Sequence, residues 1–347
     1  MACALLPEKF SLSRSLARSP LCLSKLRPSS SASSTSAGRG ATGDAFSTAA
    51  KRPRAGILRL GRPSAMLNRS ATSTPGGKPL YFMTVHDIRA LLARDKPTVG
   101  TWLQLPSPDV AELMAHAGYD WVVVDMEHGS FGRTGLPDIF RAIECGGAAP
   151  FARLPEATKT QIKSALEAGA QGLIFPMIES REQLDKAIDW AVYPGQDTWR
   201  APGETAAEYR GVGYCRANVF GKNFEEYRQE RAPELFLAAQ IEHIRAVDNL
   251  DVILTHPRLD AIMVGPYDLS GSMGLTAQFD HPDFKAAMAR IQAACQKHKA
   301  RMGLHIVQPD PAELARQVAA GSRFIAYGID SVFLWQGAER PGVENQL

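Results

Sequence analysis

Eight short apolar segments alternate with helical patterns after residue 98, and this alternation constrains the fold more than any other feature of the sequence. The segment Trp121-Val-Val-Val-Asp125 is typical of them, because β-branched side chains pack well on a pleated sheet. Repeated strand–helix units with right-handed crossovers require parallel strands, and eight units within about 250 residues predict closure into a single (β/α)8 barrel, a TIM barrel. The predicted strands are 99–105, 120–126, 148–154, 172–177, 235–242, 259–265, 301–306 and 324–328. The predicted helices are 107–116, 136–145, 158–168, 282–299 and 311–320, together with a helix that begins at 180 and a helix that follows 242 and ends at 254.

The formal net charge of +3 over 347 residues conceals two unlike parts. Residues 1–80 contain 13 Lys and Arg against two acidic residues, and they are rich in Ser, Ala, Thr and Gly. Such a segment buries too little apolar surface to offset chain entropy, so we predict a disordered leader over 1–80. The remainder, 81–347, has 26 basic and 34 acidic residues and is predicted to form the barrel domain. Its acidic balance argues against a nucleic-acid partner, and the leader has no apolar run long enough to span a membrane.

The leader, rich in Arg and Ser and poor in acids, is typical of a transit peptide for a mitochondrion or a plastid. A wrongly assigned start, with Met66 or Met83 as the true initiator, and a basic tail that binds nucleic acid are the alternatives. The tail is disfavoured because no aromatic residues interleave with its charges. Without a real leader we expect a cytoplasmic protein. The five cysteines include no C-x-x-C pair, so neither a disulfide framework nor a thiolate zinc site is implied, and a reduced compartment fits best.

Polar side chains follow several of the predicted strands at the point where each strand ends. They are Asp125, Glu127 and His128 at the second strand, Arg153 at the third, Gln240 and Glu242 at the fifth, and Gly265, Tyr267 and Asp268 at the sixth. In parallel α/β folds the carboxyl ends of the strands meet at one rim, where ligands bind. A single acid or histidine in such a place is often a solvated loop residue, but their repetition on one rim predicts an active site.

These residues suit the chemistry of a small 2-oxo acid. Glu242 and Asp268, from neighbouring strands, offer the oxygen ligands that Mg²⁺ or Mn²⁺ needs, with substrate and water as further ligands. Arg153 provides a planar charged fork for a carboxylate or a developing enolate, and His128 can serve as general base near neutral pH. The turn at Gly265 lets backbone N–H groups approach an anion. Together they predict metal-assisted enolisation.

Three motifs in this order and spacing resemble the HpcH/HpaI aldolases, a family of metal-dependent pyruvate aldolases. They are Asp125-Met-Glu-His-Gly, Gln240-Ile-Glu and Gly265-Pro-Tyr-Asp-Leu-Ser, and Arg210-Gly-Val-Gly is similar to the family's loop after the fourth strand. The resemblance runs from about Met83 to Trp335. It implies a (β/α)8 barrel in a homo-oligomer, a hexamer or a trimer. It also implies an enzyme that reversibly cleaves a 4-hydroxy-2-oxo acid to pyruvate and an aldehyde.

The resemblance further implies a catalytic role for several residues. Glu242 and Asp268 would bind the metal, Mg²⁺ or Mn²⁺, with Co²⁺ as an alternative. His128 would be the base that acts on the aldol hydroxyl, through water. Arg153 would hold the keto oxygen of pyruvate and steady its enolate, and Asp125, in the same motif as His128, is a further catalytic candidate.

Other positions are implied to contact substrate or to assist the histidine. Gln240, Gly265 and the backbone at Tyr267 would contact the substrate. Glu167 matches an acid on the third helix that raises the basicity of the histidine, although Asp is the commoner residue there. The barrel prediction puts Glu167 far from the rim of its own subunit, so it would act across a subunit interface.

The chain also departs from the family pattern, and alternatives follow. Residues 196–209 are a longer link than usual, which could reshape the aldehyde pocket, and 336–347 form a short polar tail where members often have a last helix exchanged between subunits. Citrate-lyase-like cleavage of an acyl-CoA and a non-catalytic assembly protein on an aldolase scaffold are the alternatives. A CoA site would need basic groups at the rim, and Arg200, Arg210 and Arg216 do not compel one. A Schiff-base aldolase would need a lysine at a strand end, and none of the strand ends carries one.

Overall fold

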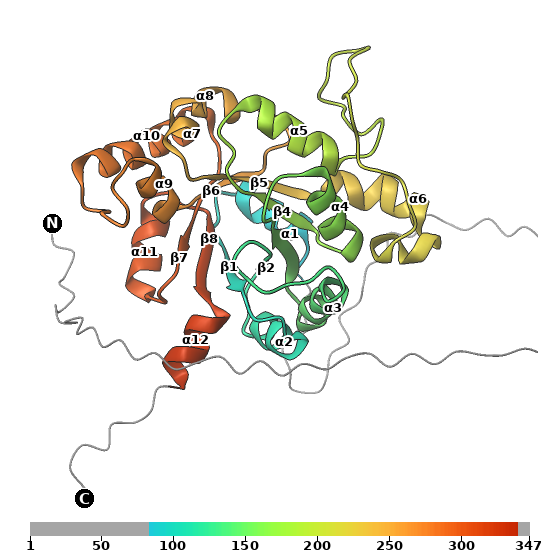
Figure 1. Cartoon of the computed structure of the whole chain (residues 1–347), viewed down its shortest axis with the longest axis horizontal. Coiled ribbons are helices and arrows are strands. Elements are labelled where there is room, and N and C mark those ends of the chain that lie inside the picture. Colours follow the sequence, from blue (N-terminus) through green and yellow to red (C-terminus); the bar gives the residue numbers. More distant parts are fainter. Residues whose placement is uncertain (1–82, 339–347) are drawn as a thin grey trace, which may run out of the picture. The chain divides into compact units, whose positions relative to one another are not determined.

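The structure is a computed structural model that describes residues 83–338, and its centre is a closed barrel of eight parallel strands (Figure 1). Each strand pairs with the next in the chain, and β8 pairs with β1. This confirms the predicted (β/α)8 barrel, and the strand ends differ from the prediction by at most two residues. The strands are β1 (Thr98–Leu103), β2 (Trp121–Asp125), β3 (Ala149–Arg153), β4 (Gly172–Phe175), β5 (Phe236–Ile241), β6 (Ala261–Val264), β7 (Met302–Ile306) and β8 (Phe324–Ile329).

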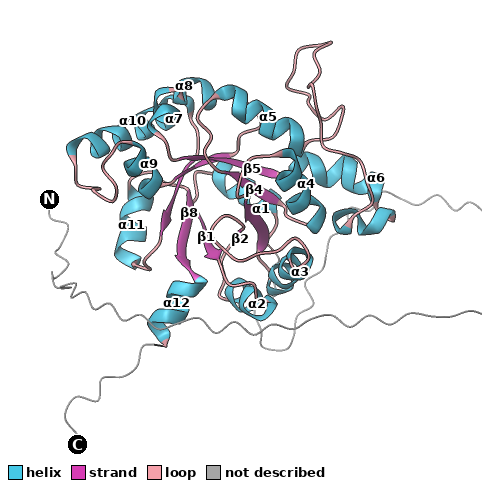
Figure 2. Cartoon of the chain, viewed as in Figure 1, coloured by secondary structure: helices cyan, strands magenta, loops and turns pink. Residues whose placement is uncertain are grey.

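Helices lie around the outside of the barrel between consecutive strands (Figure 2). Several begin at a capping side chain, because Ser107, Thr158 and Ser180 each accept a hydrogen bond from the backbone N–H three residues later. The helices are α1 (Val85–Ala93), α2 (Pro108–His116), α3 (Leu136–Gly146), α4 (Lys159–Ala168), α5 (Arg181–Ala191), α6 (Phe224–Glu226), α7 (Ile244–Asp248), α8 (Leu250–Ile253), α9 (Pro266–Ser272), α10 (Pro282–His298), α11 (Pro311–Ala319) and α12 (Asp330–Gly337).

Helix α1 was not expected from the alternation, and it closes the amino-terminal end of the barrel. It begins at a capping box in which the side chains of Thr84 and Asp87 each bond the backbone of the other. Its buried residues Val85, Ile88 and Leu92 pack with the inward-facing side chains of the strands. In Figure 1 this helix lies behind the strands, so the carboxyl ends of the strands face the viewer.

Three other regions differ from the expectation. The turn at Gly265 is the start of α9, with Gly265 as the residue before the helix and Pro266 in its first turn. Helix α12 extends to Gly337, so the expected polar tail begins inside a helix. The single helix expected between 242 and 254 is two short helices, α7 and α8, that meet at Asn249.

Four aromatic rings fill the interior of the barrel toward its amino-terminal end. Trp121, Phe151, Phe236 and Phe324 pack against one another, with centroid separations of 4.4 Å for the stacked pair Trp121–Phe324, 5.2 Å for the stacked pair Phe151–Phe236 and 5.0 Å for the tilted pair Phe236–Phe324. Gly100 makes room for the indole, since a Cβ there would lie 2.0 Å from the Trp121 ring. The barrel is therefore a packed core, and a ligand can enter its interior only from the carboxyl end.

The irregular segment expected between residues 193 and 231 contains only short helical turns. These are η1 (Arg216–Gly221), α6 and the π-helical turn η2 (Tyr227–Arg231), and a further turn, η3 (Ala232–Glu234), follows before β5. Arg210 anchors the segment, because its guanidinium lies between the rings of Tyr193 and Tyr227 at 4.6 and 5.3 Å and donates a hydrogen bond to the Tyr227 hydroxyl.

The predictions for the amino-terminal leader lie outside the described residues. They comprise the disorder of 1–80, the transit peptide and the domain boundary at residue 80. Within residues 83–338, no helix combines the length and the apolar character needed to cross a bilayer.

Candidate active site

Arg153 and Asp125 form a buried ion pair at the carboxyl ends of β3 and β2. The strand register places the two residues side by side. The Arg153 atoms Nη2 and Nε lie 2.7 and 3.0 Å from Asp125 Oδ1, and the Asp125 side chain is fully buried. The ring of Trp102, from β1, lies 5.5 Å from the guanidinium carbon. The sequence-predicted arginine is therefore held in one orientation, with its charge kept at the rim.

Asp125 also shapes the loop that follows β2. Its Oδ1 accepts hydrogen bonds from the backbone N–H groups of Glu127 and His128, at 3.2 and 3.1 Å, and its Oδ2 accepts one from Gln104 Nε2 at 3.1 Å. Burial alone would raise the pKa of Asp125, but the charge of Arg153 and these hydrogen bonds hold it below the ordinary value. Both oxygens of this ionised carboxylate are engaged by the protein, so its contacts are those of a positioning residue.

Glu242, directly after β5, is buried and held on two sides. Its Oε1 accepts a hydrogen bond from the backbone N–H of Met177 at 2.8 Å, and its Oε2 accepts one from Gln240 Nε2 at 2.6 Å. Met177 has a φ of 51°, a left-handed conformation that a non-glycine residue rarely adopts. Gly265 packs against the same carboxylate, since a Cβ there would lie 2.7 Å from Glu242 Oε2. Glycine is thus required for this close approach.

Three carboxylates, those of Glu127, Glu242 and Asp268, act on one another at this rim. Burial raises the pKa of Glu242 to about 7, and repulsion from Glu127 and Asp268 adds to the effect. Burial also raises the pKa of Glu127, although Arg153 Nη1 lies 3.0 Å from its Oε2. The cluster holds more negative charge than Arg153 can balance.

The donor set fits a hard divalent cation. Glu242 and Asp268 supply carboxylate oxygens, and the buried Gln240 Oε1 has no hydrogen-bond partner among the described residues. No group of three or more His, Cys, Asp or Glu within residues 83–338 is arranged to hold a metal ion. The protein would therefore supply two carboxylates, and substrate and water would complete the coordination.

His305, from β7, also faces the upper interior of the barrel. Its ring stacks on Trp102 with 4.6 Å between centroids, and a ring nitrogen lies 3.1 Å from the carbonyl oxygen of Gly328. Burial lowers the pKa of His305 to about 4, so it is neutral at physiological pH. Gln104 and the backbone of Met177 also belong to the rim. The positions of His305 and Gln104 near the ends of the predicted strands 301–306 and 99–105 favour a place in the pocket, whereas no signal in the sequence indicates the backbone of Met177.

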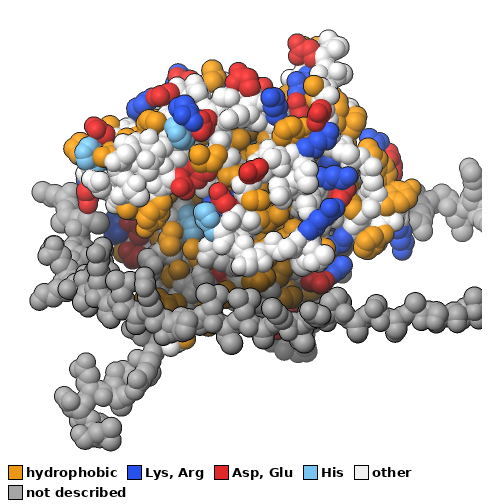
Figure 3. Space-filling view, viewed as in Figure 1, with side chains coloured by type: hydrophobic (Ala, Val, Ile, Leu, Met, Phe, Trp, Pro, Cys, Tyr) orange, Lys and Arg blue, Asp and Glu red, His pale blue; other side chains and the backbone are white. Residues whose placement is uncertain are grey.

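His128 and Tyr267 lie at the exposed mouth of the site. The His128 side chain is solvent-exposed and close enough for its charge to act on Glu127. Tyr267 is on the first turn of α9, next to Asp268, and its ring packs edge-on against Phe279 at 5.0 Å. Figure 3 shows acidic and histidine side chains gathered near the middle of this face.

Glu167 lies apart from these residues, on α4. Its carboxylate is 3.7 Å from both Arg133 Nη2 and Lys163 Nζ. Of its contacts within residues 83–338, none joins it to His128. Within one subunit these contacts do not join Glu167 to the histidine, as the barrel prediction expected, and its action across a subunit interface stays a prediction.

The family model for HpcH/HpaI aldolase/citrate lyase matches residues 98–336. The chain belongs to this family. A hydroxypyruvate/pyruvate aldolase from Paraburkholderia phytofirmans is 33% identical over 249 residues, which are 71% of this chain and 92% of the relative. A 4-hydroxy-2-oxovalerate aldolase from Novosphingobium aromaticivorans is 34% identical over 260 residues, 73% of this chain and 92% of the relative.

A solved structure of a family protein from Burkholderia cenocepacia J2315 is similar to this aldolase with a TM-score of 0.66 and 33% identity, over 72% of this chain and 95% of the other. A second, from Desulfitobacterium hafniense, has a TM-score of 0.63 and 27% identity over 74% of this chain and 98% of the other. The HpcH/HpaI aldolase described here is therefore an enzyme, a carbon–carbon lyase. The family generally depends on a divalent metal.

Proposed function

We propose that this aldolase reversibly cleaves a 4-hydroxy-2-oxo acid to pyruvate and an aldehyde, with a divalent cation bound at Glu242 and Asp268. The observation that carries the proposal is the rim itself, where a fixed guanidinium lies beside a group of mutually repelling carboxylates. The similar aldolases are named for hydroxypyruvate, pyruvate and 4-hydroxy-2-oxovalerate, which supports a substrate of this class.

Glu242 and Asp268 are the residues that would hold the cation, Mg²⁺ or Mn²⁺, with Co²⁺ as an alternative. The hydrogen bonds from Met177 and Gln240 keep the Glu242 carboxylate in place. A cation at this position supplies Lewis-acid stabilisation of negative charge on the 2-oxo group.

Arg153 stabilises the same negative charge from the protein side. Because Asp125 fixes the guanidinium before the substrate arrives, no reorganisation is needed when the keto oxygen gains charge. Gln240, Gly265 and the backbone at Tyr267 are placed around Glu242 and the start of α9, where they would contact the substrate.

His128 would move the proton of the reaction. In cleavage it accepts, through water, the proton of the C4 hydroxyl, and the C4–O bond becomes the aldehyde carbonyl. The electron pair of the C3–C4 bond passes into the enolate of pyruvate, which then takes a proton at C3. Asp125 supports this step by holding the backbone of residues 127 and 128. Glu167 would assist His128 only from a neighbouring subunit.

Other features favour the aldolase over an acyl-CoA lyase and over an imine mechanism. Arg200 is paired with Asp189, Arg216 donates to Glu144 and to the carbonyl of residue 168, and Arg210 is buried between two tyrosines. These arginines are thus engaged within the chain and not placed to bind CoA. None of the eight described strands contains a lysine, which a Schiff base would require.

The test is pyruvate release from a panel of 4-hydroxy-2-oxo acids, with metal-free protein and after addition of Mg²⁺, Mn²⁺ or Co²⁺. We expect turnover only with added metal, and the panel identifies the preferred aldehyde portion. Full activity after complete metal removal would rule out the proposed mechanism, and release of a CoA thioester product would instead support the acyl-CoA alternative.

We further propose a homo-oligomer, a hexamer or a trimer, and import into a mitochondrion or a plastid. Light scattering on the purified chain measures the assembly, and a monomer would exclude a role of Glu167 across an interface. A fluorescent protein fused after residue 80 reports the destination, and a diffuse cytoplasmic signal would contradict import.

A further inference from the structure

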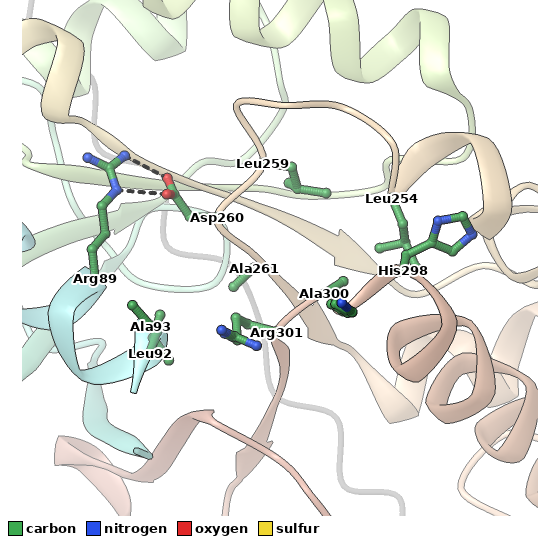
Figure 4. Close-up of a pocket in the computed structure, with 11 residues that line it drawn as sticks. Arg89, Leu92, Ala93, Leu254, Leu259, Asp260, Ala261, His298, Ala300 and Arg301 are labelled. Carbon is green, nitrogen blue, oxygen red and sulfur yellow. Dashed lines mark hydrogen bonds and ion pairs between the residues drawn. The ribbon is translucent and has the colours of Figure 1, made fainter. Parts of the chain in front are cut away.

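A cavity of about 300 Å³ lies at the amino-terminal end of the barrel, away from the catalytic rim. It is bounded by α1, by the connection that enters β6 and by the connection that enters β7 (Figure 4). Its volume is at the lower limit for pockets that bind small organic molecules. None of the residues that line it belongs to the proposed active site.

The charges at one wall of this cavity balance one another: Arg89 pairs with Asp260 and, through Nη1 at 2.7 Å, with Glu234, and Arg258 Nη1 lies 3.8 Å from Asp260 Oδ2. Arg89 Nε donates to Asp260 Oδ1 at 2.7 Å, and Arg89 Nη2 donates to Asp260 Oδ2 at 2.9 Å, as the dashed lines in Figure 4 mark. The backbone N–H of Leu237 also donates to Asp260 Oδ2. This bidentate pair therefore forms a fixed wall, and Asp260 has little charge left to repel an anion.

Two other positively charged side chains line the cavity, those of Lys299 and Arg301, and they lack an ion-pair partner among the described residues. Within residues 83–338, no acidic side chain forms an ion pair with Lys299 or Arg301. Asp95, which feels the charge of Arg301, is paired with Arg323 instead, at 3.0 Å. His298, in contrast, already lies 2.7 Å from Asp251. The cavity thus has an excess of positive charge.

The remaining lining is mainly apolar. Leu92 comes from α1, Leu254 and Leu259 come from the connection into β6, and alanines lie between them. Figure 4 shows Arg301 between the Arg89–Asp260 pair and His298 in this view. Apolar walls beside two uncompensated cations suit a molecule that has both an anionic group and an apolar body.

The backbone at Lys299 provides an independent observation. Lys299 ends α10 in the left-handed region, with φ 54°. Glycine is the residue that favours this position, and Gly147 and Gly169 occupy it at the ends of α3 and α4. A lysine here is conformationally unfavourable, so its presence is better explained by what its side chain does than by the helix end itself.

We propose that this cavity binds a small organic anion, with its phosphate or carboxylate group at Lys299 and Arg301 and its apolar body against Leu92, Leu254 and Leu259. The site is at the opposite end of β6 and β7 from the proposed active site. Binding there would therefore not require displacement of the 2-oxo acid.

The test uses phenyl phosphate as the probe, titrated into the full chain and followed by ³¹P NMR. Mg²⁺ and saturating pyruvate are present, so that the proposed active site is occupied and the Arg153 rim does not contribute. We expect saturable binding that weakens about tenfold or more in the double variant Lys299→Gln, Arg301→Gln, because both cationic contacts are lost. The control Lys285→Gln removes a lysine of α10 that pairs with Asp280, and it should bind like the wild type.

A second variant separates binding from folding. Lys299→Gly relieves the left-handed backbone, so it should melt at the same temperature as the wild type or higher while it binds phenyl phosphate more weakly. Absence of saturable binding by the wild type would overturn the proposal. So would equal affinity of wild type and double variant, or a Lys299→Gly protein that binds normally. Aldolase activity is measured in parallel and should be retained by these variants, so failure of this site is distinguishable from failure of the proposed function.

Discussion

Replacement of Glu242 by glutamine should abolish aldol cleavage and at the same time stabilise the metal-free protein. The substitution keeps the shape of the side chain. Its carbonyl oxygen can accept the hydrogen bond from Met177, and its amide can donate to Gln240 Oε1, which is buried without a partner, once the Gln240 amide rotates. What the substitution removes is a negative charge that burial and the acids Glu127 and Asp268 disfavour.

The magnitude follows from the pKa of Glu242, which rises from 4.5 to about 7 on folding. Below pH 4.5 the carboxyl is protonated in both states, so wild type and variant should be equally stable. Between these values the folded state holds a proton that the unfolded chain has released, and wild-type stability falls by about 1.4 kcal/mol per pH unit. Above pH 7 the total loss is about 3 kcal/mol, which Glu242→Gln avoids.

Urea denaturation in excess chelator, at about pH 5 and about pH 8, measures this difference. Added Mn²⁺ at about 1,000 times its Kd should reverse the order, because binding then stabilises the native wild type by about 4.1 kcal/mol, and the variant should gain little. A variant less stable than the wild type at the higher pH in chelator would refute the electrostatic reasoning. Equal stabilisation of both proteins by Mn²⁺ would refute the role of Glu242 as ligand.

Three further changes test separate parts of the structure. Gly265→Ala places a Cβ 2.7 Å from Glu242 Oε2, so metal affinity measured by Mn²⁺ titration should fall, and the free energy of unfolding should drop by about 1–3 kcal/mol. The control is Gly271→Ala, in which the atom nearest to the new Cβ is 3.7 Å away. Identical behaviour of the two variants would contradict the steric argument. Arg153→Lys should lower kcat about a hundredfold in steady-state pyruvate release, because the ammonium group of lysine cannot reproduce the planar set of N–H donors of the guanidinium. A wild-type rate would refute the role of Arg153 in stabilising the enolate. Burial lowers the pKa of His256 from 6.5 to about 4, so this group alone should lower wild-type stability by about 3 kcal/mol as the pH falls between these values, opposite in sign to the contribution of Glu242. His256→Asn should remove this contribution, so the difference in stability between variant and wild type in urea denaturation should change by that amount between about pH 7 and about pH 4, and a difference that does not change with pH would refute it.

The outline of the site was accessible from sequence because parallel strands deliver their carboxyl ends to one rim. Asp125, Arg153 and Glu242 were placed correctly on that rim by the apolar runs that precede them. The Met177 N–H could not be found in this way, because its contact with Glu242 depends on a left-handed backbone and not on a side chain. Helix α9 was missed because a Gly-Pro pair is typical both of a turn and of a helix start.

What the sequence determined by itself is the periodic part of the protein: apolar strands at regular intervals, capped helices between them, and acids, a histidine and an arginine at strand ends. Local residue order is sufficient for these, because strand and helix patterns depend on neighbouring side chains. Only the tertiary structure decided which charges meet. The burial that raises the pKa of Glu242, the room that Gly265 leaves for it, and the uncompensated charges of Lys299 and Arg301 depend on the packing of segments far apart in the chain.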